Sequence, residues 1–211
     1  MSALDFTHRF IPAEGESQRV LLLLHGTGGD EHDLLPLGRQ LDPHAALLSP
    51  RGKVLENGMP RWFRRFAEGV FDEEDVIRRA HELADFITSF QGRAVCNRPG
   101  RLQSARPCDL VALGSSNGAN NAAAMLFLRP EVLSRAILLR AVPLSKPPAA
   151  DLTGKQVLIS AGGLDPIIPP ENAQSLAALL QQRGAEVQLE VQPASHGLIA
   201  ALALARRWLG R

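Results

Sequence analysis

The chain has 211 residues, of which 45% are hydrophobic and 21% charged, and its formal net charge is +1. This composition is typical of a folded globular protein and excludes a disordered one. The near-neutral charge predicts no general attraction to nucleic acid or to an anionic membrane. The length favours a single domain over residues 1–211.

The start of the chain carries Asp5, His8 and Arg9 among its apolar residues, which is unlike a secretory signal. No run approaches the roughly 18 uninterrupted apolar residues that a membrane span requires. We therefore expect a cytoplasmic protein that does not insert stably into membranes.

The first predicted element is the apolar run Arg19-Val-Leu-Leu-Leu-Leu-His25, typical of a strand buried on both faces. It ends in the glycine-rich turn 25–29. Asp30 is placed to cap a following helix, with Asp33 in its first turn. The apolar side of that helix consists of leucines: Leu34, Leu35, Leu37 and Leu41. Residues 45–49 are predicted to form a second strand.

Residues 51–71 are predicted to form a long loop, and loops of that length are often functional. A surface helix then runs from 72 to about 90, behind an acidic first turn. Residues 91–107 contain four arginines, two prolines and two glycines, and we interpret them as an exposed, solvated insertion rather than a partner-binding segment. Cys96 and Cys108 are expected to be reduced thiols, with a disulfide as the alternative.

The second half of the chain alternates strands with helices. Predicted strands cover 109–114, 136–139, 156–161 and 186–191, and predicted helices cover 117–128, a segment after 169–170 and 198–209. Such alternation indicates a mainly parallel central sheet with helices on both faces. The last strand alternates polar and apolar residues, as an edge strand would.

The motif Gly114-Ser-Ser-Asn-Gly118 fits the pattern G-x-S-x-G, in which the serine stands at a sharp strand-to-helix turn. Alone, the pattern would occur by chance in roughly one such sequence in ten. Here an apolar strand precedes it and a helix rich in small residues follows it. This context favours Ser116 as a nucleophile over an ordinary helix N-cap serine.

A serine nucleophile needs a base and an acid that orients the base. His196 is the one histidine after Ser116, and it follows the strand that ends near 191. Asp165 follows the strand 156–161, whereas the rival acid Asp151 precedes its nearest strand and would lie at the wrong end of the sheet. The order serine, acid, histidine matches the hydrolases that carry G-x-S-x-G. We predict the triad Ser116, Asp165 and His196.

The turn 25–29 is suited to supply backbone N–H groups to a developing oxyanion. We assign the oxyanion hole to the amides of Thr27 and Asn117. A phosphate-binding loop is the alternative, but neither the Walker pattern nor G-x-G-x-x-G is present. The acidic residues 30–33 are better explained by a helix start than by a metal site. We expect no cofactor and no metal.

Together these motifs resemble the phospholipase/carboxylesterase family of small α/β-hydrolases, which includes acyl-protein thioesterases and bacterial carboxylesterases. The resemblance covers nearly the whole chain. It rests on the triad motifs Gly114–Asn120, Gly163–Pro166 and Ser195–Gly197, and on the segments His25–Asp30, Ser49–Gly52 and Pro60–Phe63.

The resemblance implies the α/β-hydrolase fold, the same triad and a small acyl pocket beside Trp62 and Phe63. Core filling is the alternative role for these two aromatic residues. Val142 and Leu144 follow another strand end and are candidates for the opposite wall. The chain departs from the family at Ser115, where bulkier residues are common, and in the arginine-rich segment 91–107.

We therefore expect a serine carboxylesterase that hydrolyses small, short-acyl esters through an acyl-enzyme. Its expected partner is a small-molecule ester, not nucleic acid, and the sequence leaves a homodimer open. One alternative is an acyl-protein thioesterase or lysophospholipase that acts on long acyl chains. Another is a non-catalytic binding protein on a hydrolase scaffold.

Overall fold

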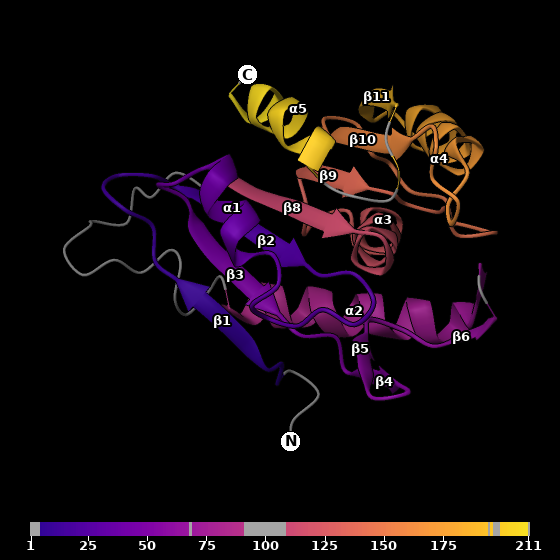
Figure 1. Ribbon diagram of the computed structural model, residues 1–211, viewed down its shortest axis with the longest axis horizontal. Coiled ribbons are helices and arrows are strands. Elements are labelled where there is room, and N and C mark those ends of the chain that lie inside the picture. The colour runs from indigo at the N-terminus through magenta and orange to yellow at the C-terminus, as the bar shows by residue number, and fades with distance from the viewer. Residues whose placement is uncertain (1–4, 68, 91–108, 194, 196–198, 211) are drawn as a thin grey trace.

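A seven-stranded sheet forms the centre of the molecule, with strand order β1-β3-β2-β8-β9-β10-β11 (Figure 1). The computed structural model describes residues 5–67, 69–90, 109–193, 195 and 199–210. The pair β1–β3 is antiparallel and the other neighbouring pairs are parallel. The strands are β1 His8–Ile11, β2 Arg19–Leu24, β3 Ala46–Pro50, β8 Asp109–Ser115, β9 Arg135–Leu139, β10 Gln156–Gly162 and β11 Glu186–Gln192.

Helices cover both faces of this sheet, as predicted (Figure 1). They are α1 Leu35–Leu41, α2 Glu73–Phe90, α3 Asn117–Leu128, α4 Pro170–Gln182 and α5 Ile199–Leu209. Strand β2 shows why its apolar run is unbroken. Leu22 and Leu24 join the core under α2, α3 and α4, whereas Leu21 and Leu23 join the core under α1 and α5. Both faces of the strand are therefore buried.

The parallel strands end together at one edge of the sheet, and hydrogen bonds join the residues that follow them. The Ser116 N–H donates to the Leu139 carbonyl at 2.8 Å, and the Arg140 N–H donates to the Ser160 carbonyl at 3.0 Å. The residues that follow β8 and β9 are thus fixed against the neighbouring strands. Side chains distant in the sequence can meet at this edge.

Three local predictions need correction. Strand β1 was not predicted, and it pairs with β3 through residues of both polar and apolar character. The predicted loop 51–71 contains two small hairpins, β4 Val54–Glu56 with β5 Met59–Arg61, and β6 Arg65–Ala67 with β7 Val70–Phe71. Helix α1 begins only after Leu34, and no side chain caps it. Asp30 instead accepts the His32 N–H in a tight turn.

The segment 91–107 and both cysteines lie outside the described residues, so the predictions about them stay predictions. Across the ranges that are described, no helix is both long enough and apolar enough to cross a membrane.

Candidate active site

Ser116 occupies a strained turn between β8 and α3. Its φ is 48° and its ψ is −114°, in a region that residues other than glycine rarely adopt. Although Ser116 stands at the N-cap position of α3, its side chain makes no capping hydrogen bond. A capping serine normally has an extended backbone. The geometry therefore disfavours the N-cap role that was the alternative for this residue.

The two glycines of the motif are required by close packing. A Cβ on Gly118 would lie 2.1 Å from the Leu24 carbonyl oxygen, and a Cβ on Gly114 would lie 2.6 Å from the Ala119 Cα. Real Cβ atoms do not approach backbone atoms so closely. Glycine at both positions lets α3 start directly against β2. Ser116, which lies between the two glycines, is thereby placed at the edge of the sheet.

The turn after β2 lies beside Ser116. A Cβ built on Gly26 would be 3.8 Å from the Ser116 Cβ, an ordinary contact distance. Neighbouring amides of this turn are engaged, since Gly28 donates to the Pro60 carbonyl at 3.0 Å. The N–H groups of Thr27 and Asn117 donate to no other residue in the described parts of the chain. These two amides are available for an anion bound at the turn.

Trp62 joins the turn after β2 to the first turn of α3.

 Its backbone N–H donates to Asn117 Oδ1 at 2.7 Å, and its indole Nε1–H donates to the His25 carbonyl at 2.8 Å. The Trp62 side chain is 2% exposed and that of Phe63 is fully buried. The structure thus gives both aromatic residues a place in the core, the alternative weighed for them, and a direct contact with an acyl group stays a prediction.

His25 was not predicted to have a role of its own, yet its side chain supports the turn after β2 through two hydrogen bonds. Its Nε2 accepts the Gly52 N–H at 3.0 Å, so the ring proton must lie on Nδ1, which donates to the Gly26 carbonyl at 2.6 Å. The imidazole is therefore neutral, because a protonated ring has no acceptor. Burial lowers the pKa of His25 below its usual value, which agrees with this assignment.

The lowered pKa of His25 predicts a loss of stability in mild acid. Because the unfolded chain binds the proton more readily, stability is fully present above the unfolded pKa of about 6.5 and falls as the pH drops toward the folded pKa. Thermal unfolding followed from neutral to acidic pH should show this decline. His25→Asn should be less stable at neutral pH and should show a flatter decline just below pH 6.5. Identical pH dependence in the two proteins would contradict the assignment.

Asp165 lies three residues beyond β10, at the same sheet edge as the strand end that precedes Ser116. Its side chain is fully buried, and its Oδ1 accepts the N–H groups of Ile167 and Ile168 at 2.9 and 3.1 Å. The rival acid Asp151 is exposed and accepts the Thr153 N–H in a turn before β10. The burial and location of Asp165 suit an orienting acid better than those of Asp151.

Arg140 is the charged residue at this edge that the sequence interpretation missed. It follows β9, is 1% exposed and has a φ of 60°. Its Nε lies 3.7 Å from Asp165 Oδ2. The available signal was an arginine placed directly after the apolar strand 136–139, at the end of the sheet where the other site residues were predicted.

The structure describes two of the three remaining predicted site residues, Val142 and Leu144, but not His196. Val142 is fixed by its N–H, which donates to Asn120 Oδ1 at 2.7 Å, and Leu144 is 9% exposed. Both residues lie on the segment that follows β9 and Arg140. His196 lies outside the described residues, so its place in the triad stays a prediction.

The acidic segment 30–33 forms part of the support of the turn. Arg51 donates to both carboxylate oxygens of Glu31, at 2.5 and 2.8 Å. This pairing lowers the pKa of Glu31 to about 2. The salt bridge thereby ties the turn after β2 to the segment after β3.

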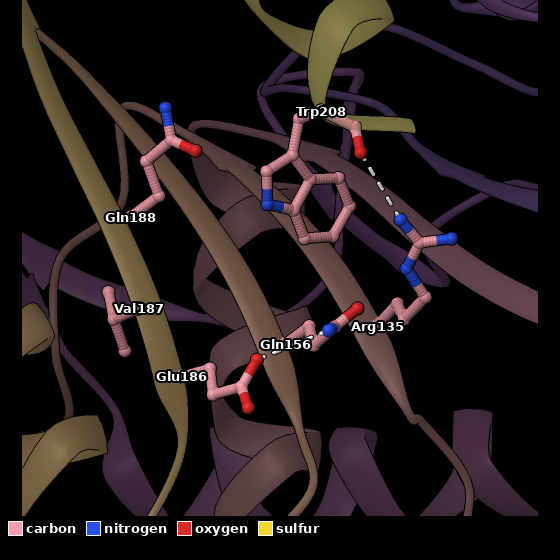
Figure 2. A pocket seen from close by; sticks show the side chains of 6 residues that line it. All are labelled: Arg135, Gln156, Glu186, Val187, Gln188 and Trp208. Carbon is pink, nitrogen blue, oxygen red and sulfur yellow. Dashed lines mark hydrogen bonds between the residues drawn. The ribbon is translucent and has the colours of Figure 1, made fainter. Parts of the chain in front are cut away.

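A cavity of about 310 Å³ lies at the opposite edge of the sheet, where β9, β10 and β11 begin (Figure 2). Its lining residues are Arg135, Gln156, Glu186, Val187, Gln188 and Trp208. Arg135 donates to the Trp208 carbonyl at 3.3 Å, and Gln156 donates to Glu186 at 3.2 Å. None of the predicted catalytic residues lines it, so the candidate site is the edge that carries Ser116.

Proteins that resemble this chain in sequence and structure carry hydrolase or carboxylesterase names. No family model matches the chain. A relative from Bacillus subtilis (strain 168), which carries the name "Putative hydrolase MhqD", is 46% identical over 202 residues, covering 95% of this chain and 96% of the relative. The solved carboxylesterase of Bacillus cereus is 41% identical with a TM-score of 0.88, covering 97% of this chain and 93% of that one. The carboxylesterase of Mesorhizobium loti is 34% identical with a TM-score of 0.87, covering 97% and 94%.

Proposed function

Because the chain belongs to the phospholipase/carboxylesterase family of α/β-hydrolases, we propose that it hydrolyses carboxylic esters with Ser116 as the nucleophile. The observation that carries this proposal is the strained backbone of Ser116, held between two close-packed glycines beside two available amides. Strain of this kind at a sheet edge is characteristic of functional positions.

In the proposed mechanism, Ser116 Oγ attacks the ester carbonyl while His196 takes the hydroxyl proton. The carbonyl oxygen becomes negatively charged and accepts hydrogen bonds from the Thr27 and Asn117 amides. Asp165 orients the imidazole and balances its positive charge. His196 then gives the proton to the departing alkoxide, which leaves an acyl-enzyme. Water, deprotonated by His196, attacks the acyl-enzyme carbonyl, and His196 returns the proton to Ser116 Oγ as the acid leaves.

Three features of the structure support this arrangement. The anion would lie where the turn after β2 meets the first turn of α3, so the partial positive charge of a helix N-terminus adds to the two hydrogen bonds. Trp62 holds the two parts together through its bonds to His25 and Asn117. The buried Asp165 is already fixed by two backbone amides, so little reorganisation is needed during the reaction.

We further propose that short acyl groups are preferred. Trp62 and Phe63 are buried in the core, which leaves the partly exposed Val142 as the predicted pocket residue available to contact a short acyl group. p-Nitrophenyl esters of increasing acyl length should therefore give a maximum of kcat/KM at short chains. A maximum at long chains, or faster turnover of a palmitoyl thioester or a lysophospholipid, would favour the alternative substrates.

Covalent labelling tests the nucleophile independently of the substrate. A fluorophosphonate probe should label the folded protein, and peptide mass spectrometry should place the adduct on Ser116. Labelling of another residue would contradict the assignment. Absence of both labelling and ester turnover in the folded protein would instead support a binding protein on a hydrolase scaffold.

A further inference from the structure

Arg140 holds an unusual position for a charged residue. It is buried at the end of β9, and its φ of 60° lies in the left-handed region. Both the burial of an arginine and this backbone conformation are unfavourable in themselves. Because both the burial and the positive φ are unfavourable, we expect Arg140 to make contacts that a smaller, uncharged residue could not make.

The guanidinium of Arg140 connects two chain segments that meet at the candidate site. Its Nε and Nη2 both donate to the Ser195 carbonyl, at 3.2 and 3.1 Å. That carbonyl belongs to the peptide bond that joins Ser195 to His196. The same Nε lies 3.7 Å from Asp165 Oδ2, and both side chains are fully buried. One planar group thus contacts the proposed acid and the backbone adjoining the proposed base.

The guanidinium is itself held in place by β10. Its Nη1 donates to the Ser160 carbonyl at 3.0 Å and to Ser160 Oγ at 3.3 Å. The backbone N–H of Arg140 donates to the same carbonyl. The side chain is therefore anchored to the rigid sheet and extends from it toward the loops after β10 and β11.

Charge distinguishes this contact from ordinary packing. Among the described residues, Asp165 is the charged group that faces the guanidinium. Burial lowers the pKa of Arg140, and the Asp165 carboxylate opposes that change. The guanidinium stays cationic in the neutral range, because the ordinary pKa of an arginine is very high. A fixed positive charge thus compensates the buried carboxylate.

We propose that Arg140 is a positioning residue that fixes Asp165 and the peptide bond before His196 in one arrangement and balances the carboxylate charge. This inference rests on the proposed Ser116–Asp165–His196 mechanism. It goes beyond that mechanism because it assigns a role to a fourth side chain, from the end of β9, that acts through Asp165 and the backbone before His196. Loss of this group should lower kcat more than it raises KM, since substrate contacts remain.

Two substitutions test the role of the guanidinium. Arg140→Gly removes the side chain but keeps a residue that tolerates a positive φ, and Arg140→Lys keeps a charge without the planar fork. We expect kcat to fall by about 100-fold in the glycine variant, the loss that misplacement of a catalytic group can produce, and by less in the lysine variant. Millimolar guanidinium chloride should restore part of the activity of Arg140→Gly, and sodium chloride at equal ionic strength should not.

The pH profile provides a readout that a purely structural role would not move. Without the neighbouring cation, a protonated base is favoured, so the acid limb of kcat/KM should move to higher pH in Arg140→Gly and stay near its wild-type position in Arg140→Lys. Arg135→Met is the matched control, because Arg135 opens the same strand at the opposite sheet edge. Its kcat and pH profile should match those of the wild type in the folded fraction.

The outcomes separate this inference from the proposed function. Unchanged kcat and pH profile in folded Arg140→Gly, while Ser116 still reacts with a fluorophosphonate, would overturn the role of Arg140 alone. Lost activity with an unmoved acid limb and no guanidinium rescue would also overturn it. If the wild type itself shows no labelling and no turnover, the proposed function fails first. If Arg140→Gly does not fold, the kcat of Arg140→Lys decides: a lower kcat with an unmoved acid limb supports the role of the planar fork, and an unchanged kcat overturns it.

Discussion

Replacing Ser116 by alanine is expected to lower kcat for a p-nitrophenyl ester by about four to six orders of magnitude, the loss measured when a serine nucleophile is removed from a triad. The reason is that Ser116 occupies the strained turn between β8 and α3, whereas the neighbouring hydroxyl belongs to Ser115, a buried residue at the end of β8. The remaining activity would come from the oxyanion amides and substrate binding. Steady-state kinetics with active-site titration would measure the loss.

The alanine variant should keep its fold, because the side chain of Ser116 makes no capping bond that α3 would lose. Its thermal unfolding midpoint should therefore stay close to that of the wild type. Ser115→Ala is the matched control: it removes the preceding hydroxyl, and its kcat should stay within a few-fold of the wild-type value. Near-normal turnover in Ser116→Ala, or a comparable loss in Ser115→Ala, would refute the assignment.

Among the substitutions proposed for this protein, Gly118→Ala is expected to lower the free energy of unfolding the most. The added Cβ would lie 2.1 Å from the Leu24 carbonyl oxygen and 2.5 Å from that of His25. Both atoms belong to the backbone around the end of β2, so no flexible side chain can move away. Overpacking against a rigid backbone should cost about 3 kcal/mol or more, which lowers the unfolding midpoint by roughly 6 to 12 °C in a chain of this size.

Gly118→Ala should also reduce activity in the fraction that remains folded, because a shift of α3 moves the Asn117 amide. The matched control is Gly210→Ala, where an added Cβ would have no neighbour closer than 3.7 Å. Chemical denaturation and ester turnover should be measured on both variants. Equal stability of the two would show that α3 can relax away from β2, and the close-packing argument would be wrong.

The sheet and its main helices were predictable because their residues repeat regularly. The unbroken apolar run of β2 and the helical spacing of α2 identify these elements without any tertiary information. Strand β1 lacked such a pattern, since an edge strand with an antiparallel neighbour needs few buried residues. The two hairpins of 54–71 were missed because their strands have only two or three residues, too few to show a period.

The candidate site was predictable where residue type and chain position alone carry information. Ser116 and Asp165 follow strands that end at the same sheet edge, and a parallel sheet brings such ends together. The role of His25 depends on Gly52, 27 residues away, and that of Arg140 depends on Ser195, 55 residues away. Such contacts arise from the three-dimensional arrangement, and one sequence without structure gives no direct sign of them.

The pairing of β2 with β8 has a consequence for the order in which the chain folds. Arg19 of β2 pairs with Asp109 of β8, so 90 residues separate the two partners along the chain. During synthesis, one edge of this leucine-rich strand has no partner until β8 has been made. Non-local pairing slows folding, and an open apolar edge invites association with other chains. Truncated chains that end before β8 should therefore aggregate rather than accumulate as a native half-sheet.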